Sequence, residues 1–239
     1  MPVEQYTLED IRLELQKAAN PKIASFLQGF FKTGRGQYGE GDQFRGIKVP
    51  VIRKIVRKAR SLSMDEVISM LDSSWHEDRL LALFVWVYQF EKAGEAGREK
   101  IFRAYLDHSG HINNWDLVDL STPTIMGGYL FNRDRSILYE MARSNNLWDR
   151  RKAVMATSYF IRNNDFDDTL SLAEILLHDS EDLIHKAVGW MLREIGKRDS
   201  ETEESFLKKY YKDMSRTMLR YAIERFPEES RQAYLKGRI

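Results

Sequence analysis

The sequence has 239 residues, of which 43% are hydrophobic and 31% are charged, so the chain can bury a sizeable core and is neither disordered nor collagen-like. Thirty-seven basic against thirty-six acidic residues give a net charge of +1, which excludes a uniformly basic nucleic-acid coat and an acidic tail. Without cysteine there is no disulfide framework, thiolate zinc site or cysteine nucleophile. No apolar run approaches about 18 residues and no signal-peptide core opens the chain, so we expect a soluble cytoplasmic protein with no membrane segment.

Apolar residues recur at helical spacing almost throughout the chain, and no convincing strand pattern appears. With only five prolines and short connections, the sequence predicts an all-α protein. The expected helices span residues 7–19, 21–33, 49–60, 64–72, 75–92, 95–109, 114–131, 134–144, 147–163, 166–178, 181–197, 200–212 and 215–226.

Four of the expected helix starts carry a side-chain acceptor followed three residues later by an acid, a pair that caps the first turn. The cap positions 113, 146 and 179 are 33 residues apart, and position 74 precedes 113 by 39. A repeat of this length is typical of an α-solenoid of the HEAT, armadillo or TPR kind. We therefore expect one HEAT-like repeat domain over residues 1–239, with a concave side that binds a partner. The pairs are Ser74/Glu77, Asn113/Asp116, Asn146/Asp149 and Asp179/Asp182.

A glycine-rich loop over residues 34–43 interrupts the helices and contains a formal G-x-G-x-x-G pattern. A dinucleotide site needs that pattern between a strand and a helix, whereas here a helical segment precedes it. The pattern therefore favours a connector, and a surface loop that touches a ligand is the other interpretation.

Basic residues gather in two stretches. Residues 43–64 include seven bases and no acid, and Arg53, Arg57 and Arg60 lie on one helix face, opposite an apolar one. This face is either a phosphate-binding surface or an ordinary solvated helix face. The second stretch, residues 150–152, has three bases early in a helix, where contact with phosphate is also plausible. The seven bases are Arg45, Lys48, Arg53, Lys54, Arg57, Lys58 and Arg60.

Trp190 lies outside the apolar stripe of its expected helix, in line with Lys186, Arg193 and Lys197. An indole among cations is what a protein that binds a cationic or sugar-phosphate ligand would present. The alternative is that Trp190 packs at the edge of the core or between repeats.

Trp115 and Asp119 form a second candidate site, because residues one helical turn apart share a face. At the 33-residue offset Asp119 corresponds to Lys152 and His185, so an acid here departs from the internal repeat. Trp115 corresponds to Trp148, which leaves a repeat-packing role open for either tryptophan.

Four segments carry a resemblance to a known family. They are Phe-Arg-Gly-Ile-Lys-Val-Pro (44–50), Asn-Trp-Asp-Leu-Val-Asp (114–119), Leu-Trp-Asp-Arg-Arg-Lys-Ala (147–153) and Lys-Ala-Val-Gly-Trp-Met-Leu-Arg-Glu (186–194). In this order they resemble the AlkD-like DNA glycosylases, the HEAT-like-repeat alkylation-repair proteins, over residues 44–225. The resemblance implies an α-solenoid with a concave basic cleft that excises cationic alkylpurines, such as 3-methyladenine and 7-methylguanine, apparently without flipping the base into a pocket.

The same resemblance implies the roles of four residues. The family's catalytic carboxylate falls on Asp119, its two cleft tryptophans fall on Trp115 and Trp190, and its backbone-contacting arginine falls on Arg151. The segment 34–43 departs from the family, because it is longer and richer in glycine than expected beside the Phe-x-Gly-Ile-x-x-Pro segment.

The chemistry fits these residues. A cationic alkylpurine is already a good leaving group, so one carboxylate that stabilises an oxocarbenium-like sugar and orients water is sufficient. No pattern of metal ligands and no serine-hydrolase motif occurs, so we expect neither a metal nor a cofactor.

The leading hypothesis is a monomeric, monofunctional DNA glycosylase for cationic alkylpurines in double-stranded DNA. Its catalytic site would use Asp119, Trp115 and Trp190. A non-catalytic binder of damaged or branched DNA is the main alternative, and a protein-interaction scaffold is a third. The bases expected to bind DNA are Arg151, Lys48, Arg53, Arg57, Lys186 and Arg193.

Overall fold

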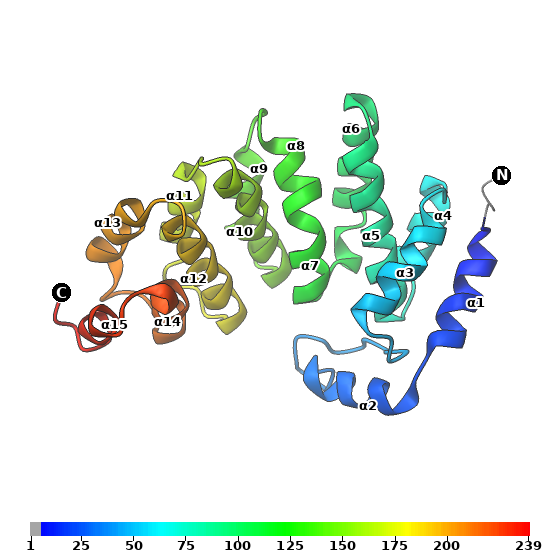
Figure 1. Cartoon of the computed structure of the whole chain (residues 1–239), viewed down its shortest axis with the longest axis horizontal. Helices are drawn as coiled ribbons and strands as arrows, with labels where there is room; N and C mark the ends of the chain where they lie inside the picture. Colours follow the sequence, from blue (N-terminus) through cyan, green and yellow to red (C-terminus); the bar gives the residue numbers. More distant parts are fainter. Residues whose placement is uncertain (1–5) are drawn as a thin grey trace. The chain divides into compact units, whose positions relative to one another are not determined.

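The computed structural model describes residues 6–239, which form helices joined mostly by short turns, with one long loop between α2 and α3 (Figure 1). These residues contain no strand, only an isolated bridge between Gln43 and Trp75, so the predicted all-α class is confirmed. The α-helices are α1 (Leu8–Ala18), α2 (Pro21–Phe30), α3 (Val49–Ala59), α4 (Met64–Leu71), α5 (His76–Lys92), α6 (Glu95–Asp107), α7 (Trp115–Thr122), α8 (Gly128–Leu130), α9 (Ser136–Met141), α10 (Leu147–Arg162), α11 (Asp167–Ile175), α12 (Asp182–Gly196), α13 (Ser200–Tyr210), α14 (Arg216–Ala222) and α15 (Glu228–Leu235).

The chain divides into two compact units, unit 1 (Met1–Ser121) and unit 2 (Thr122–Ile239). The expectation of one domain over residues 1–239 stays a prediction. No helix within residues 6–239 is both long and apolar enough to cross a lipid bilayer.

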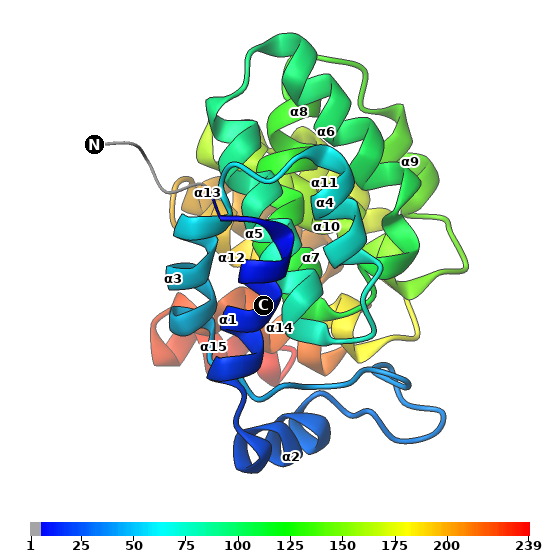
Figure 2. The same cartoon turned by 90° about the vertical axis from the view of Figure 1, so that its right-hand side faces the viewer.

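Helix α5 forms the centre of unit 1. Its first eleven residues are all buried, because an apolar run over residues 80–86 gives the helix no solvent face. Helices α3, α4 and α6 pack against it, and α1 packs against α3 (Figure 2). Helix α2 lies apart from these helices and buries none of its residues.

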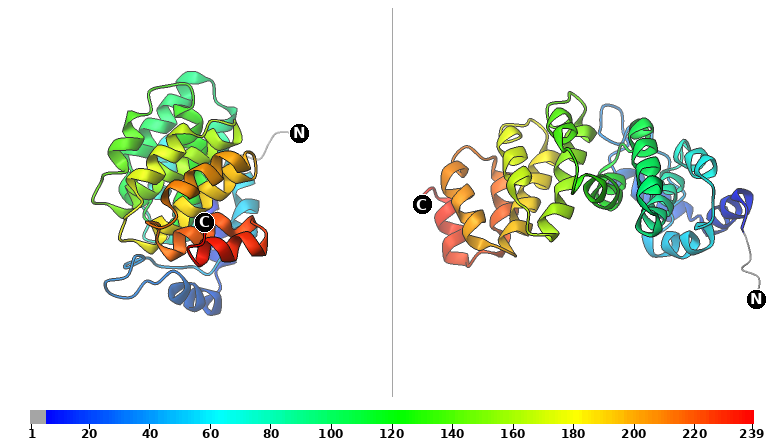
Figure 3. Two further views of the ribbon diagram at one scale, coloured as in Figure 1. Left: turned by 90° about the vertical axis from the view of Figure 1, so that its left-hand side faces the viewer. Right: turned by 90° about the horizontal axis from the view of Figure 1, so that it is seen from above.

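Unit 2 is built from successive helix pairs. Helices α10, α12 and α14 lie side by side, and α9, α11 and α13 pack on them (Figure 3). Together with α7, the starts of these three helices follow one another at intervals of 32, 35 and 34 residues. The period read from the sequence is therefore close to the spacing of these helices.

Two glycines mark equivalent close approaches between neighbouring helices of unit 2. A Cβ on Gly127 would lie 2.3 Å from the carbonyl oxygen of Ala156, and one on Gly189 would lie 2.3 Å from that of Met218. The contacted residue is 29 positions later in both cases. Only glycine allows the backbones to come so near, so the same packing contact occurs twice in this unit.

The predicted helix caps are only partly present. Asn146 does cap its helix, because its side chain accepts a hydrogen bond of 2.8 Å from the backbone of Trp148. Its expected partner Asp149 instead accepts from the hydroxyl of Ser144. The complete capping boxes within residues 6–239 are Thr7/Asp10 on α1 and Ser63/Glu66 on α4.

The predicted capping pairs that begin at positions 74, 113 and 179 are wrong, because their acids engage other partners. Glu77 accepts hydrogen bonds from the backbone of the preceding loop. Asp116 accepts from His76, and Asp182 pairs with Lys186. An acid three residues into a helix therefore has a local partner in some helices and a distant one in others.

The prediction of one helix over residues 114–131 is also wrong. Helix α7 ends at Thr122, and a π-helical turn (Pro123–Gly127) leads into α8. Proline has no N–H to continue the α-helical hydrogen bonds, so the register changes there. At the other end of unit 2, the structure has a helix that the sequence pattern did not predict, α15 after Pro227.

Candidate functional site

Trp115 and Asp119 lie one turn apart on α7, as the sequence predicts, and both are partly exposed. The indole of Trp115 stacks on Phe31 with ring centroids 5.3 Å apart, and it meets Phe30 edge-on at 6.1 Å. Its backbone N–H donates to the side chain of Asn114 at 2.8 Å. Trp115 is therefore fixed both at its ring and at its backbone.

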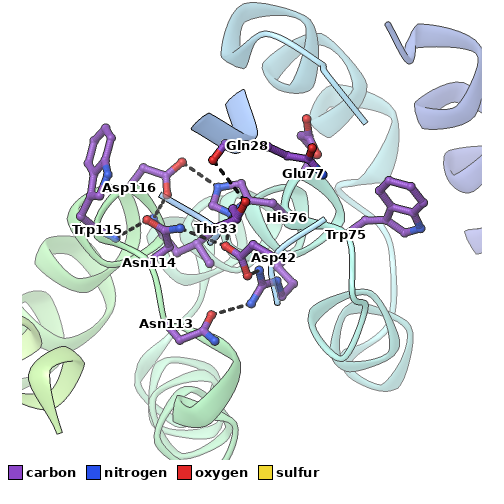
Figure 4. A network of polar contacts seen from close by, with 12 residues as sticks. Gln28, Thr33, Asp42, Trp75, His76, Glu77, Asn113, Asn114, Trp115 and Asp116 are labelled. Atoms are coloured by element: carbon purple, nitrogen blue, oxygen red, sulfur yellow. Dashed lines mark hydrogen bonds and ion pairs between the residues drawn. The ribbon is translucent and has the colours of Figure 1, made fainter. Parts of the chain in front are cut away.

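A buried histidine lies at the centre of a polar network next to Trp115 (Figure 4). His76 is 2% exposed, and its two ring nitrogens donate to Asp42 at 3.1 Å and to Asp116 at 2.9 Å. Burial alone disfavours the imidazolium, but the two carboxylates outweigh it and raise the pKa of His76 to about 9. The side chain is therefore a cation at neutral pH, held between two anions.

The carboxylate of Asp42 collects further donors from α5 and from the segment before α7. Arg79 forms an ion pair with it, and the amide of Asn114 donates to it at 2.9 Å. These donors and His76 keep the pKa of Asp42 below its usual value despite burial. Arg79 also donates to the side chain of Asn113. The network thus links the glycine-rich loop, α5 and the start of α7.

The segment that follows the glycine-rich loop is bound to the first turn of α5. Glu77 accepts hydrogen bonds of 2.8–3.0 Å from the backbone N–H groups of Arg45, Gly46 and Ile47. Arg45 in turn makes a bidentate ion pair with Asp78, at 2.6 and 2.8 Å. The Phe-x-Gly-Ile segment is therefore a structural anchor.

Gly46 brings this anchor against the start of α2. It has φ +81°, and a Cβ there would lie 2.1 Å from the carbonyl oxygen of Asn20. The backbone N–H of Asn20 donates to the carbonyl of Arg45 at 2.8 Å. Only glycine fits this backbone conformation and this contact.

Aromatic rings cover the buried histidine. Phe44 stacks on His76 with centroids 4.6 Å apart, and Phe31 lies 5.0 Å from the same ring. Because Phe31 also stacks on Trp115, the rings connect the buried cation to the partly exposed indole.

The basic residues of α3 point outward in unit 1. Lys48, Arg53 and Arg57 are exposed, whereas Ile52 and Ile55 on the opposite face are buried. Arg53 lies over the ring of Phe84 at 4.4 Å. Within residues 6–239 neither Lys48 nor Arg57 has an ion-pair partner. Lys48 and Arg57 thus carry uncompensated positive charge, whereas Lys58 of the same helix pairs with Glu14 at 2.7 Å.

In unit 2, Trp190 and its neighbouring bases are partnered by acids. The indole N–H of Trp190 donates to Glu194 at 2.9 Å, and the ring is partly exposed. Lys186 pairs with Asp182 at 2.7 Å, and Arg193 pairs with Glu224. The cations that the sequence places around Trp190 are therefore neutralised locally.

The bases that follow Trp148 also face inward. Arg151 is 4% exposed and donates to the carbonyl oxygen of Leu183. Arg150 pairs with Asp179 at 2.6 Å. Lys152 is fully buried, which lowers its pKa to about 8. The DNA-binding role of Arg151 stays a prediction.

Family comparison agrees with the four resembling segments. The model of a family described as DNA alkylation repair enzyme matches residues 11–226. The chain belongs to the DNA alkylation repair enzyme family. The match covers every residue that the sequence singles out as a site candidate. Comparison with curated proteins gives no match.

A solved structure shares the fold of this family member. It is described as a predicted DNA alkylation repair enzyme from Enterococcus faecalis, and it aligns with a TM-score of 0.68 at 16% sequence identity. The alignment covers 88% of this chain and 97% of that chain. This structural similarity shows that the two chains share the same fold.

Sequence reasoning missed the buried network of this DNA alkylation repair family member. Four consecutive polar residues, His76 to Arg79, are all at most 4% exposed. The available signal was their position directly before the apolar run of α5, since a helix buried on all sides also buries its first turn. Within residues 6–239 no group of three or more acidic or histidine side chains gathers as a metal site requires.

Proposed function

We propose that this protein is a monofunctional DNA glycosylase that hydrolyses the N-glycosidic bond of cationic alkylpurines, such as 3-methyladenine and 7-methylguanine. The observation that carries the proposal is the pair of Trp115 and Asp119 on one face of α7, in a member of the DNA alkylation repair enzyme family. Both residues are partly exposed.

Asp119 is the proposed catalytic residue. The bond between C1′ and N9 breaks, and its electron pair neutralises the positive charge of the departing purine. The sugar becomes oxocarbenium-like, and the carboxylate of Asp119 stabilises this charge and orients water for addition to C1′. The added water gives up a proton to bulk solvent, and the products are a neutral purine and an abasic site. No acid has to protonate the leaving base.

Trp115 is the proposed contact for the cationic nucleotide. An indole face attracts a cation and excludes water from it. The stacking of Trp115 on Phe31, and of Phe31 against His76, holds that face in place before DNA binds. In unit 2, Trp190 and Arg151 are proposed for the roles that the family resemblance implies, as a second tryptophan contact and a contact to the DNA backbone. Arg151 would have to leave the carbonyl of Leu183 to reach a phosphate.

The bases of α3 are proposed to bind phosphates. Lys48, Arg53 and Arg57 are exposed. Neutralising phosphates releases counterions, so affinity should fall steeply as salt rises. Lys186 and Arg193 are the proposed phosphate contacts of unit 2, and each would have to leave its carboxylate partner.

The test is a single-turnover assay on a duplex with one 7-methylguanine, with free base and alkali-labile abasic sites quantified together. The proposal expects equal amounts of both products, none from the unmodified duplex, and an unchanged rate in the presence of a chelator. Salt-sensitive binding without either product, on 3-methyladenine as well, would favour a non-catalytic binder of damaged or branched DNA.

A further inference from the structure

Helix α2 carries the two most exposed large hydrophobic side chains of the described residues, and both are phenylalanines. Phe26 is 68% exposed and Phe30 is 53% exposed, the two largest values among the large hydrophobic side chains of residues 6–239. They lie one turn apart, with nearly parallel rings whose centroids are 6.1 Å apart. We call this pair the α2 aromatic face.

The α2 aromatic face continues the aromatic surface of Trp115. Phe30 meets the edge of the Trp115 ring at 6.1 Å and that of Phe31 at 5.1 Å. The rings therefore form a row from Phe26 in solvent to Trp115, at the proposed catalytic helix. A ligand bound at Trp115 would have this row beside it.

The segment that carries the α2 aromatic face is basic. Residues 20–41 contain Lys22, Lys32 and Arg35, and a single acid, Glu40. The three bases are exposed, and Glu40 accepts a hydrogen bond from the backbone of Gly36 at 2.7 Å. Flat apolar rings among cations suit an occupant that combines flat aromatic faces with negative charge, which is the chemistry of unstacked nucleotides.

The face is held by its own unit before any ligand binds. The start of α2 is bound through the backbone of Asn20 to Arg45, which lies in the segment anchored by Glu77. At the other end, Phe31 is buried between Phe44 and Trp115. A surface fixed at both ends loses little conformational entropy on binding.

From these observations we infer that Phe26 and Phe30 stack on nucleobases that have left the DNA helix next to the base contacted by Trp115. The inference rests on the proposed function and adds a preference for DNA structure. In a fully paired duplex the base faces are covered by neighbouring bases. A duplex with an unpaired base presents a free face and should therefore bind more tightly.

The experiment compares the affinities for a fully paired duplex and for the same duplex with one bulged 2-aminopurine, whose fluorescence reports stacking. Wild type should bind the bulged duplex more tightly and quench the probe. Phe26→Ala should weaken binding to the bulged duplex about tenfold and to the paired duplex by less than about twofold, the usual loss for one base–aromatic stack. Phe26 does not contact Trp115, so this variant leaves the proposed catalytic helix intact.

Two variants serve as controls. Phe26→Tyr keeps a stacking ring and should retain both the affinity and the quenching. Leu13→Ala removes another exposed apolar side chain of unit 1, 45% exposed on α1, and should change neither.

The inference is overturned if Phe26→Ala leaves affinity and quenching as in wild type, or if it weakens both duplexes equally. It is also overturned if the variant converts a wild-type dimer to a monomer with unchanged DNA binding, because a second copy would then occupy the face. If wild type still releases 7-methylguanine in any of these cases, the proposed glycosylase function is retained and only the stacking inference fails. If wild type binds neither duplex, both fail together.

Discussion

The surroundings of Trp115 in unit 1 and of Trp190 in unit 2 differ in how charge is arranged. Next to Trp115 the charges are buried, and the same unit exposes Lys48, directly before α3, and Arg57 on α3, which have no acidic partner within residues 6–239. Around Trp190 the cations lie at the surface and are paired with acids of the same unit. A row of basic residues in the sequence therefore forms a positively charged surface only where no acidic side chain of the fold pairs with it.

The largest difference should appear in the free energy of unfolding, when the buried histidine near Trp115 or the acid that pairs with Trp190 is removed. His76→Ala leaves Asp116 as a buried carboxylate without its cation and leaves Asp42 with Arg79 alone as its cation, which should cost about 3–5 kcal/mol. Glu194→Ala removes only a partly exposed acceptor of Trp190 and should cost less than about 1 kcal/mol. Denaturant unfolding of both variants measures the two losses. Equal losses would show that the buried network contributes no more than a surface contact.

The next effect concerns DNA affinity. Lys48→Gln with Arg57→Gln should reduce the slope of log affinity against log salt by about two, one for each phosphate contact. Lys186→Gln with Arg193→Gln should reduce it by less than about one, because these cations are already paired with acids. Fluorescence anisotropy over a salt series measures both slopes. A larger change in the second variant would reverse the proposed roles of α3 and α12.

The stability of the protein should depend on pH because of the buried cation His76 in unit 1. The pKa of His76 is raised from 6.5 to about 9, so its contribution is full below pH 6.5 and is lost as pH rises through 9. The free energy of unfolding should fall over this range by on the order of 2 kcal/mol more in wild type than in His76→Gln, which cannot titrate. Parallel curves for the two proteins would mean that His76 is neutral in the folded state.

Unit 2 contains the opposite case, a buried acid. Burial raises the pKa of Glu203 to about 8, with a further contribution from Glu204. The stability that its protonated form provides is present below pH 4.5 and lost as pH rises through 8. Glu203→Gln should therefore raise the melting temperature by about 2–4 °C at pH 8 and change it little at pH 4.5. A lower melting temperature of the variant at pH 8 would contradict this assignment.

The sequence predicted the helices well because their apolar periodicity is strong and most connections are short. It failed where a local rule competed with a distant contact. The acid of the pair Asn113/Asp116 looked like a capping residue, but its partner is His76, forty positions earlier. The helix predicted over residues 114–131 breaks at Pro123, where the apolar pattern continues on both sides although proline cannot continue the hydrogen bonds.

The candidate site was predictable in part. The shared face of Trp115 and Asp119 follows from helical spacing alone, and the exposed face of α3 follows from its amphipathic pattern. The acidic partners of Lys186 and Arg193 do not both follow from helical spacing. Asp182 is one turn from Lys186 on the same helix, but Glu224 belongs to the next pair of helices.

The most direct test of the central claim compares the single-turnover release of 7-methylguanine by wild type, Asp119→Asn and Asp107→Asn. Asp107 is an exposed carboxylate at the end of α6 in the same unit, so its variant matches the change in charge. We expect Asp119→Asn to remain folded and bound to DNA but to release the base about a hundredfold to a thousandfold more slowly, while Asp107→Asn matches wild type. Release by Asp119→Asn at the wild-type rate would contradict the assignment of Asp119 as the catalytic carboxylate.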